Sequence, residues 1–214
     1  MSKELAPHQD FMTVADMKRQ VGVIHQIMKT IMKSDTHYGI IPGTQKPTLY
    51  KPGAEKIMMA FHLTADTETE TLMDDDDEYR VRIKTKMYNR AGDLLGTGLG
   101  EASSSEEKYK WRRAICDEEW DEADADRKRE KWFKGYQGKQ AYKQKQIRTQ
   151  VADIRNTIVK MCAKRSLIAA ILNVTAAGDL FTQDIEDMSP EIREEIMGDA
   201  KPTVDMPQET PAAT

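Results

Sequence analysis

EYRVRIKTKMYNRAGDLLGTGLGEAS, residues 78–103, is the stretch that decides the fold of this chain. Its first half alternates apolar and charged residues, which is the period of a strand with one buried face. NRAGD (89–93) supplies a hairpin turn, and LLGTGLGEAS returns as the partner strand. Gly96, Gly98 and Gly100 lack the lysine of a phosphate-binding loop, so they predict a strand that passes close beneath a helix.

The segments on either side of this hairpin predict an α+β fold. LTADTETETLM (63–73) also alternates and predicts a third antiparallel strand, joined through the turn DDDD (74–77). Before it, apolar residues at spacings of three and four predict a helix over 14–32. YGIIPG and PTLYKPG then predict a short hairpin, followed by a helix at about 54–62. A long helix over about 149–173 is expected to pack against the sheet.

Charge and composition divide the chain into a body and a tail. We expect one domain over 1–183, interrupted by a charged, aromatic and partly helical insertion at about 106–148. Residues 184–214 carry too few apolar side chains to fold, so an acidic and largely disordered tail is expected. The net charge of −4 hides thirteen Lys and Arg against two acids between 127 and 165. Such a basic segment predicts a body that binds a polyanion, and a solvated helix surface is the alternative.

Composition also disfavours several classes of protein. No apolar run approaches the ~18 residues of a membrane span, and the N-terminus lacks the apolar stretch of a signal peptide. Cys116 and Cys162 imply no disulfide framework, so a reducing cytoplasm is expected. No spacing of His and Cys predicts a metal site. Without a nucleophile motif or a phosphate loop, we expect neither an enzyme nor a cofactor.

Positive charge gathers at several places in the predicted fold. Cations in register on one face of the strand at 79–88 repel one another, which favours contact with a phosphate backbone; a charge-protected edge strand is the alternative. Rings interleaved with bases in the insertion suit the stacking of unpaired bases, and ordinary packing or a subunit contact is the alternative. The candidate DNA-binding residues are Arg80, Arg82, Lys84, Lys86, Arg155, Lys160, Lys164, Arg165, Lys46, Lys51, Trp132 and Lys134.

Three segments, taken in order, resemble the single-strand annealing proteins of phages. They are YGIIPGTQKPTLYKPGAEKIMMAF (38–61), YRVRIKTKMYNRAGDLLGTGLGEASS (79–104) and IRNTIVKMCAKRSLIAAIL (154–172). The family includes the Erf, Red beta and RecT groups and a eukaryotic recombination-mediator relative. The resemblance covers about 20–180, broken by the insertion, and rests on element order and loose patterns rather than on an invariant motif.

The resemblance implies an ATP-independent protein of phage or prophage origin that acts in the bacterial cytoplasm. Such proteins assemble into homo-oligomeric rings or helical filaments and hold one DNA strand in a positively charged groove. By position, Lys164 and Arg165 match the basic pair on the family's long helix, and Arg82, Lys84 and Lys86 match groove-lining strand positions. The acidic tail would then dock a partner exonuclease or a host single-strand binding protein; a solubilising tail is the alternative.

The function expected from the sequence is therefore annealing of complementary strands in homologous recombination. Two alternatives remain open at this point. One is a passive protein that protects single-stranded DNA without annealing it. The other binds no DNA and uses the aromatic insertion to inhibit or tether a host factor.

Overall fold

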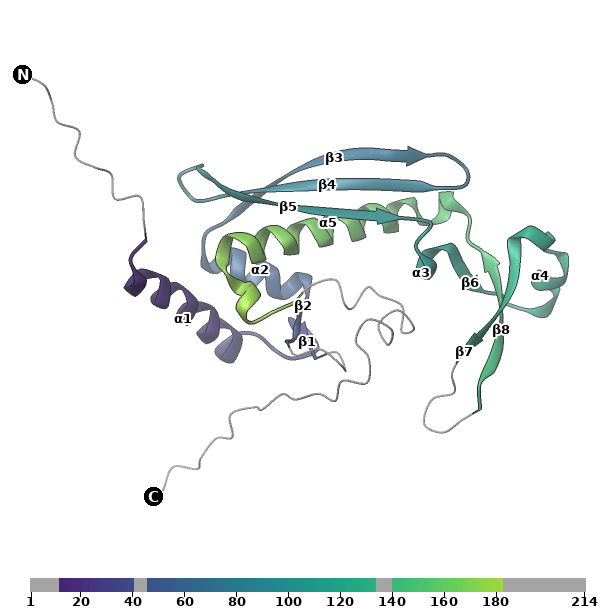
Figure 1. Cartoon of the computed structure of the whole chain (residues 1–214), viewed down its shortest axis with the longest axis horizontal. Coiled ribbons are helices and arrows are strands. Elements are labelled where there is room, and N and C mark those ends of the chain that lie inside the picture. The colour runs from purple at the N-terminus through teal and green to yellow at the C-terminus, as the bar shows by residue number, and fades with distance from the viewer. Residues whose placement is uncertain (1–11, 41–45, 134–139, 183–214) are drawn as a thin grey trace, which may run out of the picture.

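The computed structural model describes residues 12–40, 46–133 and 140–182, and it confirms the predicted α+β class (Figure 1). Helices and antiparallel sheets alternate along the chain in the predicted order, with additional strands inside the insertion. The elements are α1 Val14–Thr30, β1 Tyr38–Gly39, β2 Thr48–Leu49, α2 Lys51–Ala60, β3 Thr64–Asp74, β4 Tyr79–Tyr88, β5 Leu94–Ser103, α3 Glu107–Lys110, β6 Trp111–Arg113, α4 Asp117–Glu122, η1 Ala125–Arg127, β7 Lys128–Phe133, β8 Tyr142–Arg148, α5 Val151–Thr175 and η2 Ala177–Asp179.

Strands β3, β4 and β5 form an antiparallel meander, the central sheet, as the alternating pattern predicts. One face of this sheet lies on α5 and the other faces solvent (Figure 1). Along β4, Val81, Ile83 and Met87 point into the protein and are at most 3% exposed. The charged residues between them lie on the outer face, since successive side chains of a strand alternate.

The glycines of β5 allow α5 to approach the sheet closely, which confirms the predicted role of these residues. A Cβ atom on Gly100 would lie 2.5 Å from the amide nitrogen of Ser166 and 2.6 Å from the carbonyl oxygen of Cys162. A Cβ on Gly98 would collide with the backbone of Ala170. Cys162, Ser166 and Ala170 recur every four residues, so they place a stripe of small side chains against the glycines.

The N-terminal elements pack around the C-terminal half of α5. Helix α1 is confirmed, but it buries only part of its apolar stripe: Ile24 and Ile27 join the core, whereas Val14 and Met17 are 69% and 54% exposed. The short hairpin is also confirmed, and β2 is fully buried between β1 and Thr182. Helix α2 begins at residue 51, earlier than predicted, because proline is favoured in the first turn of a helix.

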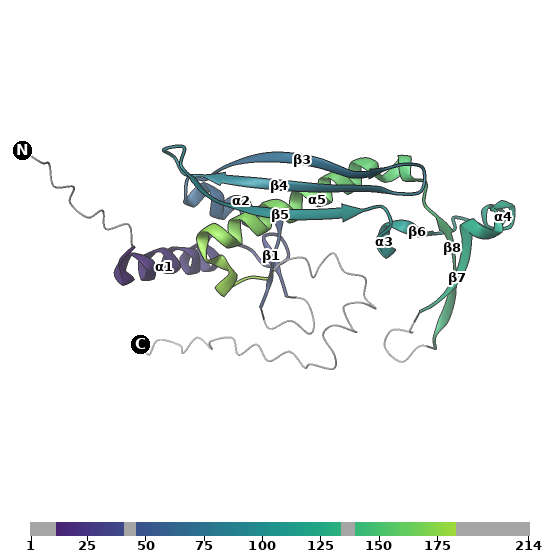
Figure 2. The same ribbon diagram turned by 45° about the horizontal axis from the view of Figure 1, so that its top comes forward.

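The insertion folds into a second lobe, α3 to β8, with its own antiparallel sheet in the order β6-β8-β7, the second sheet. Figures 1 and 2 place this lobe at the opposite end of the molecule from α1. The prediction of a partly helical insertion is confirmed by α3 and α4, but the sheet was not predicted. The strands are short and rich in charge, so they lack the apolar alternation by which strands are recognised.

No helix within the described ranges is long and apolar enough to cross a membrane. The predicted acidic tail and the candidate residue Lys134 lie outside the described residues.

Candidate nucleic-acid interface

The cations of β4 stand on the outer face of the central sheet, as predicted, but acids from neighbouring strands are interspersed among them. The register places Glu68 and Glu70 of β3 opposite Lys84 and Arg82. Arg82 lies 3.6 Å from Glu70 and 2.9 Å from a carboxylate oxygen of Glu101 on β5, and Lys86 pairs with Glu68. The inference of an uncompensated row of repelling cations is therefore wrong. The outer face is a charge-balanced ladder, which is a usual stabilising pattern across strands.

The cations of α5 lie on the other side of the central sheet from those of β4, so the two sets do not form one surface. Arg155 pairs with Asp74 at the end of β3, and its guanidinium lies 5.0 Å from the ring centroid of Tyr79. Lys160 is exposed and Lys164 is half-buried. Lys160 thus remains accessible, while Arg155 joins α5 to the sheet.

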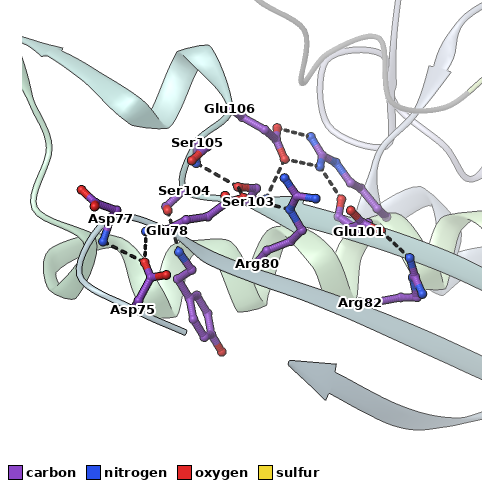
Figure 3. A network of polar contacts seen from close by, with 12 residues as sticks. Asp75, Asp77, Glu78, Arg80, Arg82, Glu101, Ser103, Ser104, Ser105 and Glu106 are labelled. Atoms are coloured by element: carbon purple, nitrogen blue, oxygen red, sulfur yellow. Dashed lines mark hydrogen bonds and ion pairs between the residues drawn. The ribbon is translucent and has the colours of Figure 1, made fainter. Parts of the chain in front are cut away.

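Ser103 and Glu106 belong to a polar network where β5 ends and the second lobe begins (Figure 3), and Arg165 of α5 binds to this network. Its two guanidinium nitrogens donate to both carboxylate oxygens of Glu106 at 2.7 and 2.8 Å, and one also donates to the carbonyl of Glu101. Ser103 donates its hydroxyl to Glu78, and Ser104 accepts from the amide of Tyr79. With its side chain 15% exposed, Arg165 holds the second lobe onto β5 rather than offering an open cation.

The charges in this network shift the carboxylate equilibria. Burial raises the pKa of Glu106, but hydrogen bonds from Arg165 and from the amide of Ser103 outweigh burial and leave the pKa below its ordinary value. A hydrogen bond from Ser103, with a smaller effect of Arg80, likewise lowers the pKa of Glu78. Both groups are therefore held as carboxylates at neutral pH, and the network stays intact there.

The two candidate lysines near the N-terminal hairpin, Lys46 and Lys51, both contact other residues of the protein. Lys46 donates to the carbonyl of Gly178 at 2.8 Å, and Lys51 pairs with Glu55 one turn along α2. The contact of Lys46 helps to close the hairpin against the C-terminal end of the described chain, whereas that of Lys51 stays within α2.

The second sheet carries the strongest local excess of positive charge. Its strands contain eight Lys and Arg and a single acid, Glu130. Acids outside the strands neutralise part of this excess: Glu107 of α3 binds Arg129 and Lys131, and Asp117 of α4 binds Lys145 at 2.8 Å. Exposed cations remain at Arg113 and at Lys143, which is 49% exposed although it pairs with Glu130.

The acids of α4 are held in place by the cations of the second sheet. A hydrogen bond from Arg112 and one from the amide of Ile115 lower the pKa of Glu119 to about 2. A hydrogen bond from Lys145 lowers the pKa of Asp117. Helix α4 therefore covers one end of the sheet with fixed negative charge and leaves the β7–β8 end basic.

Aromatic rings lie at the β7–β8 end, on both faces of the sheet. Trp132 is 62% exposed, and the ammonium of Lys143 lies 5.3 Å from its ring centroid. On the opposite face, Phe133 and Tyr142 stack with centroids 5.7 Å apart, and Tyr142 is 51% exposed. Trp132, the aromatic residue among the candidate DNA-binding residues, is thus exposed, as contact with DNA would require. Exposed apolar side chains that gather in one patch often mark an interaction site, whereas single ones are common on protein surfaces.

The candidate residues chosen from the sequence did not include Arg113, Tyr142 and Lys143, although Tyr142 and Lys143 lie in the insertion whose interleaved rings and bases predicted contact with single strands. Part of the signal was present, because YKQKQIR alternates lysines with amides at 143–146, whereas KREKWF shows no such period. A two-residue period with polar residues on both faces indicates an exposed β-ribbon.

Within the described residues, no group of His, Cys, Asp and Glu side chains is arranged to hold a metal ion. No family model matches this chain, and no curated protein or solved structure matches it either.

Proposed function

We propose that this protein binds single-stranded DNA and anneals complementary strands without ATP. The observation that carries the proposal is the second sheet, in which eight cations face one acid on the strands and exposed rings stand beside the cations. Phosphate contacts supply affinity for any sequence, and rings suit bases that are not already stacked in a duplex. The element order of the remaining chain, with a hairpin, a helix, a three-stranded sheet and a long helix, agrees with the annealing-protein resemblance.

The second lobe would make the principal phosphate contacts, and α5 would make additional ones. Arg113 and Lys143 are the accessible cations of the second sheet, and Lys160 and Lys164 extend along α5. The outer face of β4 is assigned a smaller part, because acids on β3 and β5 balance its cations, whereas the strands of the second sheet carry a single acid.

Annealing requires a DNA strand that is held extended over many nucleotides. We therefore also propose that the protein assembles into homo-oligomers, as rings or filaments. The exposed Val14 and Met17 of α1 offer an apolar surface for such contacts. The acidic residues 184–214 would contact a partner exonuclease or a host single-strand binding protein in the bacterial cytoplasm. Light scattering with and without DNA tests assembly, and monomers under both conditions would contradict it.

The test of DNA binding is the fluorescence polarisation of a labelled ~40-nucleotide single strand over a salt series, followed by addition of its complement. Binding should weaken steeply with salt, and the strands should pair faster than they do without protein. Arg113→Ala with Lys143→Ala should lower the affinity and reduce the salt slope by up to about two. Lys29→Ala, at an exposed lysine of α1, is the matched control and should change neither quantity.

The other outcomes of this binding and annealing experiment would support different functions. Tight binding without faster pairing would identify a passive protector. No binding at low salt would reject the proposal and favour an interaction protein that uses the exposed rings of the second lobe.

A further inference from the structure

The β7–β8 hairpin combines rings, cations and a cleft in a way that phosphate binding alone does not require. Trp132 lies opposite Lys143 in the strand register, and Phe133 lies opposite Tyr142. Because neighbouring positions on a strand point to opposite faces, the two ring positions belong to the two faces of one ribbon. A protein that needed only charge would gain nothing from exposing Trp132 and Tyr142.

The surroundings of Tyr142 form a concave site. Tyr142 lines a cleft of about 540 Å³ together with Arg113, Lys143 and Lys145. This volume falls within the range of about 300–1,000 Å³ that is typical of small-ligand sites. Asp117 and Glu130 line the cleft too, but each is paired with a lysine, so the cations exceed the acids by one.

The chemistry of the cleft suits one nucleotide unit. A planar ring at the rim can take a base by stacking, while the guanidinium of Arg113 can take the adjoining phosphate in two hydrogen bonds. On the other face of the ribbon, the ammonium of Lys143 lies 5.3 Å from the ring centroid of Trp132. A duplex keeps its bases stacked inside, so neither ring could reach a base there.

We propose that the β7–β8 hairpin is a base-stacking site for unpaired nucleotides, with Tyr142 and Trp132 as the stacking rings on its two faces. It would make the protein select single strands over duplexes without reading their sequence. This inference rests on the proposed function, because it names the part of the DNA that the second lobe recognises.

The experiment compares three labelled 20-nucleotide probes by fluorescence polarisation at one moderate salt concentration. The probes are oligothymidylate, a strand of the same length that carries abasic sites in place of bases, and a duplex. Tyr142→Ala and Trp132→Ala should each weaken binding to oligothymidylate roughly 5- to 150-fold, the range for loss of one stacked base. Binding to the abasic strand and to the duplex should change less than about twofold, because these probes offer no free base to stack.

Conservative variants separate stacking from a structural role. Tyr142→Phe and Trp132→Phe keep a ring and should retain most of the affinity for oligothymidylate. Met59→Ala, at an exposed apolar side chain of α2 far along the chain, is the matched control and should behave as the unaltered protein.

The inference and the proposed function fail in different ways. If the unaltered protein binds the abasic strand as tightly as oligothymidylate, or the alanine variants lose affinity for all probes equally, the rings do not stack on bases and the inference is overturned. If the unaltered protein binds no probe even when the measurement is repeated at low salt, the proposed function itself fails.

Discussion

At the scale of single residues, the glycines of β5 determine how closely α5 lies on the central sheet. Gly98→Ala places a methyl group against the backbone of Ala170, which cannot move as a side-chain end could. We expect this variant to lose about 1–3 kcal/mol of unfolding free energy, the usual effect of overpacking a core. Urea denaturation followed by circular dichroism measures the loss.

Gly22, unlike Gly98, has room for an added methyl group. It lies inside α1 with no atom within 4 Å of an added Cβ, so Gly22→Ala should stabilise the protein by about 0.5–1 kcal/mol. If the two alanine variants changed stability by the same amount and sign, close packing at Gly98 would not be the reason for its glycine.

The ion pair between Glu106 and Arg165 predicts a pH-dependent stability. The pKa of Glu106 lies below its ordinary value of 4.5, since the hydrogen bonds from Arg165 and Ser103 outweigh burial. A carboxylate with a lowered folded-state pKa adds stability above the unfolded-state pKa, and that stability is lost as the pH falls through the folded-state pKa. Glu106→Gln should therefore lower the unfolding free energy at pH 7 by about 1–3 kcal/mol and flatten its decline below about pH 5.

A double-mutant cycle identifies the cause of that pH dependence. On an Arg165→Met background, Glu106→Gln should change stability and its pH profile much less than it does alone, because the partner is already missing. Equal effects on both backgrounds would show that Arg165 does not determine the behaviour of Glu106.

At the scale of elements, α5 and β4 are joined by a buried pair of hydroxyl groups. Thr85 and Ser166 are fully buried, and their oxygens lie 2.8 Å apart. Ser166→Ala should cost about 1–3 kcal/mol of unfolding free energy, because the hydroxyl of Thr85 loses its partner. Adding Thr85→Val should recover most of that loss, since replacing both partners with apolar groups of similar shape is nearly neutral. A double variant less stable than Ser166→Ala alone would contradict this account.

The same elements show what the sequence could and could not predict. The alternation of β4 and the glycines of β5 predicted the sheet and its helix, because burial of one face imposes a visible period. Ion pairs across strands were missed, since they depend on register: Glu68 and Glu70 are 12 and more residues from their partners in β4. The DTETETL pattern of β3 carried the missing signal, as its acids share one face. The second sheet escaped prediction because its strands bury few apolar side chains.

At the scale of the whole molecule, the second lobe is separable from the fold that carries it. None of its described residues in 111–133 and 140–148 belongs to the two apolar clusters, which lie between α1, α2, the central sheet and α5. The two ends of this segment also meet, because the amide of Thr149 donates to the carbonyl of Lys110 at 2.9 Å. Replacing 111–148 with two glycines should therefore preserve a cooperatively unfolding body.

That shortened protein gives the sharpest test of where single-stranded DNA binds. If the second lobe holds the principal site, the affinity for a ~40-nucleotide single strand should fall at least about tenfold, and the remaining binding should have a lower salt slope because fewer phosphates are neutralised. Thermal unfolding by circular dichroism provides the control, since a body that still unfolds cooperatively excludes misfolding as the cause. An affinity and a salt slope equal to those of the full chain would instead assign the DNA to the body, with Lys160 and Lys164 of α5 as the first residues to replace.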